Sequence, residues 1–235
     1  MTGRTALVTG GTRGIGHAIA EHLQKRGERV IVTGTRKDGQ APTGCGYEAV
    51  DFSDPQASQN FADKVAGLGI DILINNAGIN KIAPFAEIDP ADFARIQAVN
   101  VTAPFLLARA VIPHMRKQGW GRIVNISSIW GKISRAQRGS YSASKFALDG
   151  MTAALAAEVA KDGILANCIA PGFIETELTQ RMLGAEGLAQ IVKEIPLGRL
   201  GNVLEIAVFA AWLAGPENSY ISGQNIAIDG GFTRV

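Results

Sequence analysis

Thr5-Ala-Leu-Val-Thr9 is a short apolar run, and Gly10-Gly11-Thr12-Arg13-Gly14-Ile15-Gly16 follows it directly. Apolar residues then recur at helical spacing, at Ile15, Ile19, Ala20 and Leu23. A strand, a glycine turn and a helix in this order are typical of a dinucleotide-binding segment. Without Cβ atoms the glycines let the backbone approach a pyrophosphate, whose charge meets the open N–H groups of the helix. The spacing is G-x-x-x-G-x-G rather than G-x-G-x-x-G, and a turn that binds nothing stays the alternative.

Strand-like and helical runs alternate along the rest of the chain. The strand-like runs are 5–9, 29–33, 47–51, 71–75, 122–127, 165–170 and 225–228, and the helical runs are 15–26, 55–66, 90–117, 140–161 and 203–214. This alternation predicts an α/β fold, a Rossmann-like, doubly wound parallel sheet of about seven strands with helices on both faces. We expect a single domain over 1–235. Between Arg36 and Tyr47 the chain is rich in breakers and too short for a crossover helix, so a loop is expected there.

The composition indicates a globular protein that works inside the cell. Of 235 residues 46% are hydrophobic and 19% charged, with a net charge of +2. No signal peptide and no apolar run near 18 residues stands out, so we expect a cytoplasmic protein without a membrane segment. Two cysteines, Cys45 and Cys168, and three scattered histidines predict neither a disulfide framework nor a metal site. No motif for binding nucleic acid is present.

Tyr141 and Lys145 form a Y-x-x-x-K pair that follows Ser128 by 13 positions. Residues four apart share one face of a helix, so the phenol and the ammonium should point the same way. A neighbouring cation favours the phenolate and should lower the pKa of the tyrosine. Such a phenol suits proton transfer to an oxygen in redox chemistry. Taken alone, the pair is also compatible with an ordinary amphipathic helix.

The motifs together resemble the short-chain dehydrogenase/reductase family in its single-domain form. The resemblance runs from about Arg4 to Gly231 and rests on residues in matching order and spacing: Gly10 to Gly16, Asn75-Asn76-Ala77-Gly78, Asn100, Ser128, Tyr141, Lys145 and Pro171-Gly172. Within the family the chain most resembles the 3-oxoacyl-acyl-carrier-protein reductases. The resemblance implies an oxidoreductase that moves a hydride between a nicotinamide and a carbonyl or secondary alcohol.

The resemblance also implies a role for each residue of a catalytic tetrad. Ser128 would orient the substrate carbonyl, and Tyr141 would give it a proton. Lys145 would lower the pKa of Tyr141 and bind the nicotinamide ribose. Asn100 would hold a water that passes protons to Lys145.

NADP(H) is the cofactor that the basic residues favour. NAD-preferring members carry an acidic residue after the second strand, whereas this chain has Thr35 and Arg36 there and no acid until Asp38. Arg13 would be a second basic contact for the 2′-phosphate, and guanidinium groups match phosphate geometry. The alternative is that the short loop moves Arg36 away. Further cofactor contacts implied by the resemblance are Asp51, Phe52, Asn76, Ala77, Gly78, Pro171, Gly172, Ile174 and Thr176.

The substrate is less closely defined. A small carbonyl or alcohol substrate should lie under a lid at 175–200 that includes Met182 and Leu183. Gly119 and Asp162 stand where carrier-protein reductases place basic docking residues, which makes an acyl carrier protein a doubtful partner. Arg135 and Arg138 favour instead a small anionic substrate, such as a sugar derivative handled by a polyol dehydrogenase. A non-catalytic cofactor-sensing protein is a remote alternative, which the intact tetrad argues against.

Two features outside the motifs carry expectations of their own. From Phe93 through Leu148 the chain has nine Lys or Arg and no Asp or Glu, which indicates either an anionic partner or solvated helix faces. The helical runs 90–117 and 140–161 have more apolar residues than one sheet face covers: Val101, Phe105, Leu106, Ile112, Phe146, Leu148, Met151 and Leu155. Family members pair these helices, and their last strands, across two-fold axes, so a homotetramer is expected.

Overall fold

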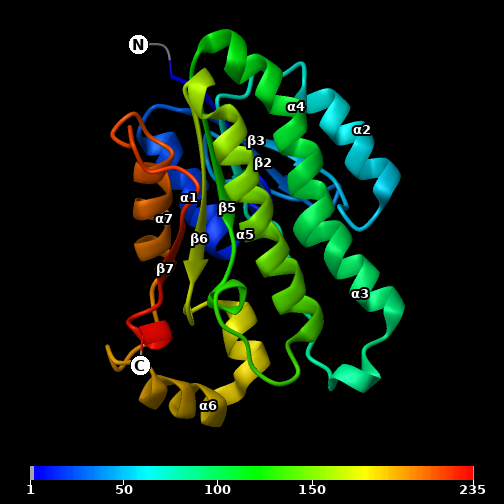
Figure 1. The fold of residues 1–235 in the computed structure, drawn as a ribbon, viewed down its shortest axis with the longest axis vertical. Helices are drawn as coiled ribbons and strands as arrows, with labels where there is room; N and C mark the ends of the chain where they lie inside the picture. Colours follow the sequence, from blue (N-terminus) through cyan, green and yellow to red (C-terminus); the bar gives the residue numbers. More distant parts are fainter. Residues whose placement is uncertain (1–2, 235) are drawn as a thin grey trace.

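Seven parallel strands form one sheet. The computed structural model describes residues 3–234, and at 177, 178, 180–183 and 185 the backbone alone. The strands are β1 (Thr5–Val8), β2 (Arg29–Gly34), β3 (Gly46–Ala49), β4 (Ile72–Asn75), β5 (Gly121–Ile126), β6 (Ile164–Pro171) and β7 (Asn225–Ile228). Their order is β3-β2-β1-β4-β5-β6-β7 (Figure 1). Strands are added toward one edge from β1 to β3 and toward the other edge from β4 to β7, so the switch point lies between β1 and β4. Such folds bind ligands at this point, at the carboxyl ends of the strands. The predicted fold class is confirmed.

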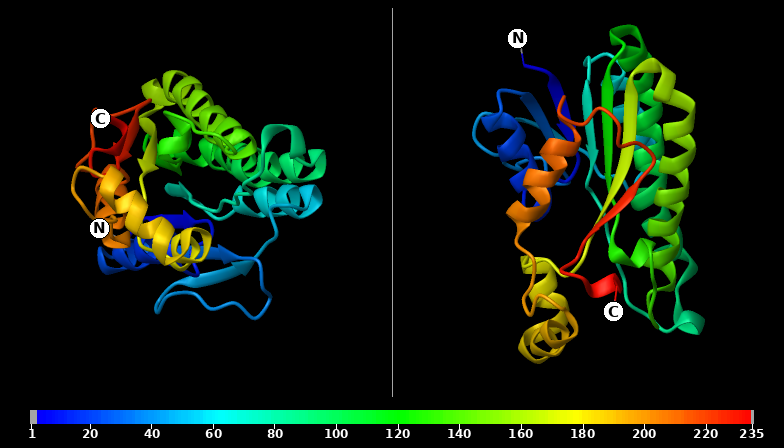
Figure 2. Two further views of the ribbon diagram at one scale, coloured as in Figure 1. Left: turned by 90° about the horizontal axis from the view of Figure 1, so that it is seen from below. Right: turned by 60° about the vertical axis from the view of Figure 1, so that its left-hand side comes forward.

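Helices cover both faces of the sheet (Figure 2). The helices are α1 (Gly14–Lys25), α2 (Pro55–Val65), α3 (Pro90–Gln97), α4 (Ala103–Gln118), α5 (Gly139–Val159), α6 (Glu177–Glu194) and α7 (Val203–Leu213). One face is packed by α1 and α7, whose Ile19, Leu23 and Ile206 are at most 1% exposed. The other face is packed by α2, α4 and α5. Leu107 and Met115 on α4 and Val159 on α5 are also at most 1% exposed. Buried apolar strands between two helix layers are typical of a parallel sheet.

The expected helical run 90–117 is not one regular helix. A π-helical turn, η2 (Ala98–Thr102), separates α3 from α4 and contains Asn100. Single π turns often occur at functional sites. By length and composition Pro90–Gln118 is apolar enough to cross a membrane, with 44% of its most apolar window buried in the fold. Leu107, Val111 and Met115 pack this helix against the sheet, which accounts for its apolar character.

The connection after β6 is helical where the sequence predicted only a lid. α6 begins at Glu177 with Thr176 as its N-cap, and its regular path breaks at Gly184, where φ is +63° and ψ 178°. Figure 1 shows α6 beyond the carboxyl ends of the strands. The expected lid residues Met182 and Leu183 lie outside the described side chains, so the lid stays a prediction. Between β2 and β3 the expected loop is confirmed, since 35–45 contains no helix.

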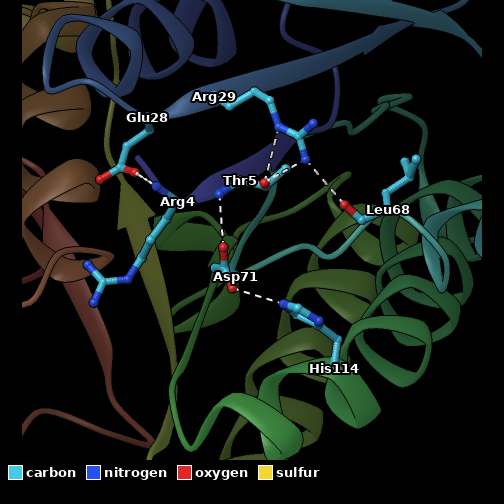
Figure 3. A network of polar contacts seen from close by, with 7 residues as sticks. All are labelled: Arg4, Thr5, Glu28, Arg29, Leu68, Asp71 and His114. Carbon is cyan, nitrogen blue, oxygen red and sulfur yellow. Dashed lines mark hydrogen bonds and ion pairs between the residues drawn. The ribbon is translucent and has the colours of Figure 1, made fainter. Parts of the chain in front are cut away.

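A polar network holds the amino ends of the strands, opposite the expected site (Figure 3). Asp71 Oδ2 accepts from the backbone N–H of Thr5 at 2.9 Å, and Asp71 Oδ1 lies 3.0 Å from His114 Nε2 on α4. Arg29 Nη2 donates to Thr5 Oγ1 at 2.8 Å. These contacts join β1, β2 and α4 at one point. They give His114, which fitted no motif, a structural role.

Candidate active site

The glycine turn forms an open backbone cradle at the start of α1. Gly10 and Gly14 have φ of +64° and +56°, a conformation that favours glycine. A Cβ on Gly16 would lie 2.4 Å from both Gly10 O and Asn76 Nδ2, so only glycine fits there. The first turn of α1 contains no acidic residue. Its unpaired N–H groups therefore fit a pyrophosphate, as the sequence predicts.

Asn76 and Thr9 fix the cradle to the sheet. Asn76 Nδ2 donates to Thr9 O at 2.9 Å and to Gly10 O at 3.1 Å. Thr9 Oγ1 accepts from the backbone N–H groups of Asn76 and Ala77, both at 2.9 Å. Sequence reasoning missed Thr9, although its place as the last residue before the glycines marks it. Asn75 Nδ2 donates to Asn125 Oδ1 at 2.8 Å, so it holds β4 to β5.

The residues expected at the 2′-phosphate are exposed at the end of β2. Arg13 is the residue before α1, and Thr35 and Arg36 follow β2. Arg36 is not free, because its Nε and Nη2 donate to the two carboxylate oxygens of Asp38 at 2.9 and 2.6 Å. Exposed pairs of this kind contribute little to stability and exchange partners readily. A phosphate can therefore compete with Asp38 for the guanidinium.

Asp51 and Phe52 follow β3 at the same edge. Asp51 Oδ1 accepts from the backbone N–H and the hydroxyl of Ser53, at 2.9 and 2.7 Å, and these bonds lower the pKa of Asp51. The ionised carboxylate suits a contact with an adenine amino group. The Phe52 ring is 5% exposed and packs edge-on to Phe61. The ring therefore belongs to the core, and a contact of Phe52 with the cofactor stays a prediction.

Ser128, Tyr141 and Lys145 come together at the carboxyl end of β5. Ser128 follows β5, and its Oγ accepts from the backbone N–H of Trp130 at 3.2 Å. Tyr141 and Lys145 lie in the first turns of α5. Lys145 is 3% exposed, its Nζ donates to Ile126 O at 2.8 Å, and it lies 5.5 Å from the centre of the Tyr141 ring. The structure thus brings three of the four predicted catalytic groups to one place.

Burial controls the acidity of this pair. It raises the pKa of Tyr141 above its usual value, while the Ser128 hydroxyl and the charge of Arg138 act in the opposite direction. It also lowers the pKa of Lys145 to about 8. The net change at Tyr141 is opposite to the predicted lowering by Lys145. A phenol with a raised pKa stays protonated at neutral pH, which suits a proton donor.

Asn100 holds the wall of the site from the π-helical turn. Its Oδ1 accepts from Ile79 N at 2.9 Å, and its Nδ2 donates to Ile79 O and to Ser144 Oγ, both at 3.0 Å. Both amide N–H groups are therefore used within the protein. This geometry gives Asn100 a positioning function, and the water relay stays a prediction. Ser144 was missed, although it is the neighbour of Lys145.

The segment after β6 passes over the same edge. A Cβ on Gly172 would lie 2.7 Å from Asp229 Cα, so the chain is closely packed there. Ile174 is 5% exposed in the core. Thr176 lies next to the glycine turn. A Cβ built on Gly14 would be 3.8 Å from Thr176 Cγ2. Thr176 thus borders the cradle, and cofactor contacts of Pro171, Gly172 and Ile174 stay predictions.

Several basic residues at 93–148 bond to other parts of the chain. Arg122 is 5% exposed and donates to the carbonyls of Gly121, Gly163 and Asn218. Arg116 Nε donates to Asp162 at 2.6 Å. Among the described side chains no cluster of three His, Cys, Asp or Glu is placed to hold a metal ion. Cys45 and Cys168 are both free thiols.

Comparison with known proteins gives matches over the whole chain. A family model described as enoyl-(acyl carrier protein) reductase matches residues 10–233. The 3-oxoacyl-acyl-carrier-protein reductase of Vibrio cholerae is 38% identical over 244 residues, covering 100% of this chain and 99% of that protein. The corresponding reductase of Escherichia coli is 39% identical over 242 residues, covering 99% and 98%. A gluconate 5-dehydrogenase of Burkholderia cenocepacia, solved with NADP and tartrate, superposes with a TM-score of 0.91 at 34% identity, covering 100% and 97%.

Proposed function

This chain belongs to the short-chain dehydrogenase/reductase family and is an oxidoreductase, and on that premise we propose that it is an NADP(H)-dependent reductase of 3-oxoacyl thioesters. The observation that carries the proposal is the meeting of Ser128, Tyr141 and Lys145 beside the glycine cradle. Full-length similarity to reductases of 3-oxoacyl groups supports the substrate class.

The chain's own groups supply binding and the proton. NADPH, when bound, supplies the hydride that the carbonyl carbon receives. The glycine cradle holds the pyrophosphate, and Arg13, Thr35 and Arg36 are the groups available to a 2′-phosphate. Ser128 donates a hydrogen bond to the carbonyl oxygen, and Tyr141 transfers its phenolic proton to that oxygen. The raised pKa of Tyr141 favours this direction, because the phenol is protonated before each reduction. Lys145 and Arg138 then face the phenolate as cations.

The thioester is proposed to be a small one, such as a coenzyme A ester. Asp162 stands where the resemblance to carrier-protein reductases implies a basic residue. In this chain Asp162 is paired with Arg116. An acidic carrier protein would meet the Arg116–Asp162 ion pair there instead of a free cation. The surface thus argues against docking of a carrier at this place.

A substrate panel tests the proposed function. Acetoacetyl coenzyme A, acetoacetyl carrier protein, an α-diketone and 5-ketogluconate are offered with NADPH, and loss of NADPH absorbance is the readout. We expect the highest kcat/KM with acetoacetyl coenzyme A. A higher kcat/KM with 5-ketogluconate would instead make this a sugar-acid dehydrogenase, as the solved Burkholderia protein is named.

We also propose that the chain works as a homotetramer in the cytoplasm. Phe105 on α4 and Phe146 on α5 are 49% and 46% exposed, and Leu204 and Val208 on α7 are 56% and 51% exposed. Leu148 is 1% exposed and belongs to the core, which corrects its assignment to the interface. Exposed apolar helix faces of this kind mark interfaces between subunits. One two-fold axis would pair α4 and α5, and the other would pair β7 and α7.

Light scattering tests the assembly. We expect wild type near four times the chain mass of 24.8 kDa. Phe146→Asp should give a smaller species, because a charge would be buried at the α4–α5 contact. Phe93→Asp on α3, where the side chain is 41% exposed, is the matched control and should remain a tetramer. A fully active wild-type monomer would refute the proposal.

A further inference from the structure

Two arginines lie in the loop just before the catalytic helix, with no internal counter-ion. Among the described side chains no carboxylate lies within 4 Å of Arg135 or Arg138. Arg135 is exposed, whereas Arg138 is partly buried three residues before Tyr141. Burial and the charge of Arg135 both lower the pKa of Arg138, so its surroundings disfavour the cation. A partly buried cation in such a place gains from an incoming anion.

The Arg138 guanidinium lies against an aromatic wall. Its carbon is 5.6 Å from the centre of the Trp130 ring. Trp130 is 6% exposed, and its ring meets Phe173 and Phe232 edge-on, at centroid distances of 6.1 and 6.3 Å. This wall begins two residues after Ser128 and lies along one side of the partly buried guanidinium. Attraction between opposite charges is stronger where water is excluded.

The loop contains a strained backbone conformation just before Arg138. Gln137 has φ of +69° and is the one non-glycine residue with positive φ among the described residues. Its carbonyl accepts from the backbone N–H of Ala83 at 3.3 Å, which ties the loop to the segment that follows β4. Such a conformation costs about 1–3 kcal/mol and persists where the surrounding structure fixes it. Strained residues of this kind are concentrated at ligand sites.

We propose that Arg138 is the counter-ion for a carboxylate that the ketone substrate carries close to its carbonyl. The substrate class is then an oxo acid, and within the proposed function it is a 3-oxoacyl thioester whose chain ends in a carboxylate. This inference rests on the proposed function, since it places the anion next to the ketone that Tyr141 protonates. Arg138 is a specificity-determining residue in this arrangement.

Matched substrate pairs test the inference. 3-Oxoadipyl coenzyme A is compared with 3-oxohexanoyl coenzyme A, and 3-oxobutanoate with its methyl ester, so that each pair differs by one negative charge. We expect wild type to prefer the charged member of at least one pair. Arg138→Gln should lower that preference by about 10–100-fold, the value of one charge-assisted contact. Arg138→Lys should retain part of it, and Arg109→Gln, which removes an exposed charge on α4, should retain all of it.

Other outcomes separate this inference from the proposed function. Reduction of the neutral members without any preference for charge would overturn the carboxylate site and leave the ketoreductase standing. An equal fall on charged and neutral members in Arg138→Gln would show that Arg138 acts on Tyr141, and would also overturn it. If no ketone is reduced, the proposed function fails, and the site is still tested by calorimetry of malonate binding to the NADP⁺-bound protein. Equal malonate affinity in wild type and Arg138→Gln would then refute the carboxylate site.

Discussion

Tyr141→Phe is expected to lower kcat for ketone reduction by about 10²–10⁴-fold, the usual contribution of a positioned general acid. The phenyl ring keeps the packing of the first turn of α5, and only the proton donor is lost. Binding of NADPH, measured by fluorescence titration, should stay close to wild type. The glycine cradle and its Asn76 brace do not involve the phenol, so the loss should appear in the chemical step alone.

The pH profile supplies a second readout for the same residue. Because burial raises the pKa of Tyr141, the phenol is protonated across the neutral range. The reduction rate of wild type should therefore be flat below the pKa of Lys145, which is about 8, and should fall further as the pH rises through the pKa of the phenol. The residual rate of Tyr141→Phe should lack this fall. Tyr220→Phe is the matched control, since Tyr220 is 97% exposed. A Tyr141→Phe rate above about a tenth of wild type would remove Tyr141 from the mechanism.

The sequence predicts the sheet well because each strand can be recognised from the hydrophobic pattern of a short segment. Runs such as 5–9 and 122–127 carry apolar residues on both faces, and the glycine turn indicates where α1 begins. The π-helical turn at Asn100 escaped prediction because apolar residues continue through it at near-helical spacing. α6 was missed because Gly184 interrupts its pattern, and the structure shows a break there inside the helix.

The electrostatics of the site depend on contacts between distant segments. The spacing of Tyr141 and Lys145 gives one shared helix face, and both lie on it as predicted. It does not reveal that Lys145 donates to Ile126 O on β5, or that burial outweighs neighbouring charge at the phenol. Arg36 is a second case. Its partner Asp38 is only two residues away. The two residues lie in a loop rather than in a helix or strand, so their spacing alone does not predict that the side chains meet.

Arg36→Asp is expected to raise the KM for NADPH by about 10–100-fold and to change the KM for NADH little. A charge-assisted contact with the 2′-phosphate contributes about 1.5–3 kcal/mol, and NADH has no such phosphate. Steady-state kinetics with both cofactors gives the two values. Asp38 occupies the Nε–Nη2 edge of the guanidinium, so Asp38→Asn should act in the opposite direction and lower the KM for NADPH.

These opposite signs make the pair of variants decisive. If Arg36 lies too far from the cofactor, neither substitution changes the preference for NADPH over NADH, and Arg13 and Thr35 would have to carry it. Lys37→Asp is the matched control, because Lys37 is an exposed cation next in sequence that donates no hydrogen bond to Asp38 in this structure. It should raise the KM for NADPH less than Arg36→Asp does. A wild-type protein that prefers NADH would contradict the assignment of NADP(H) itself, because the end of β2 would then bind a ribose hydroxyl without an acidic residue to accept from it.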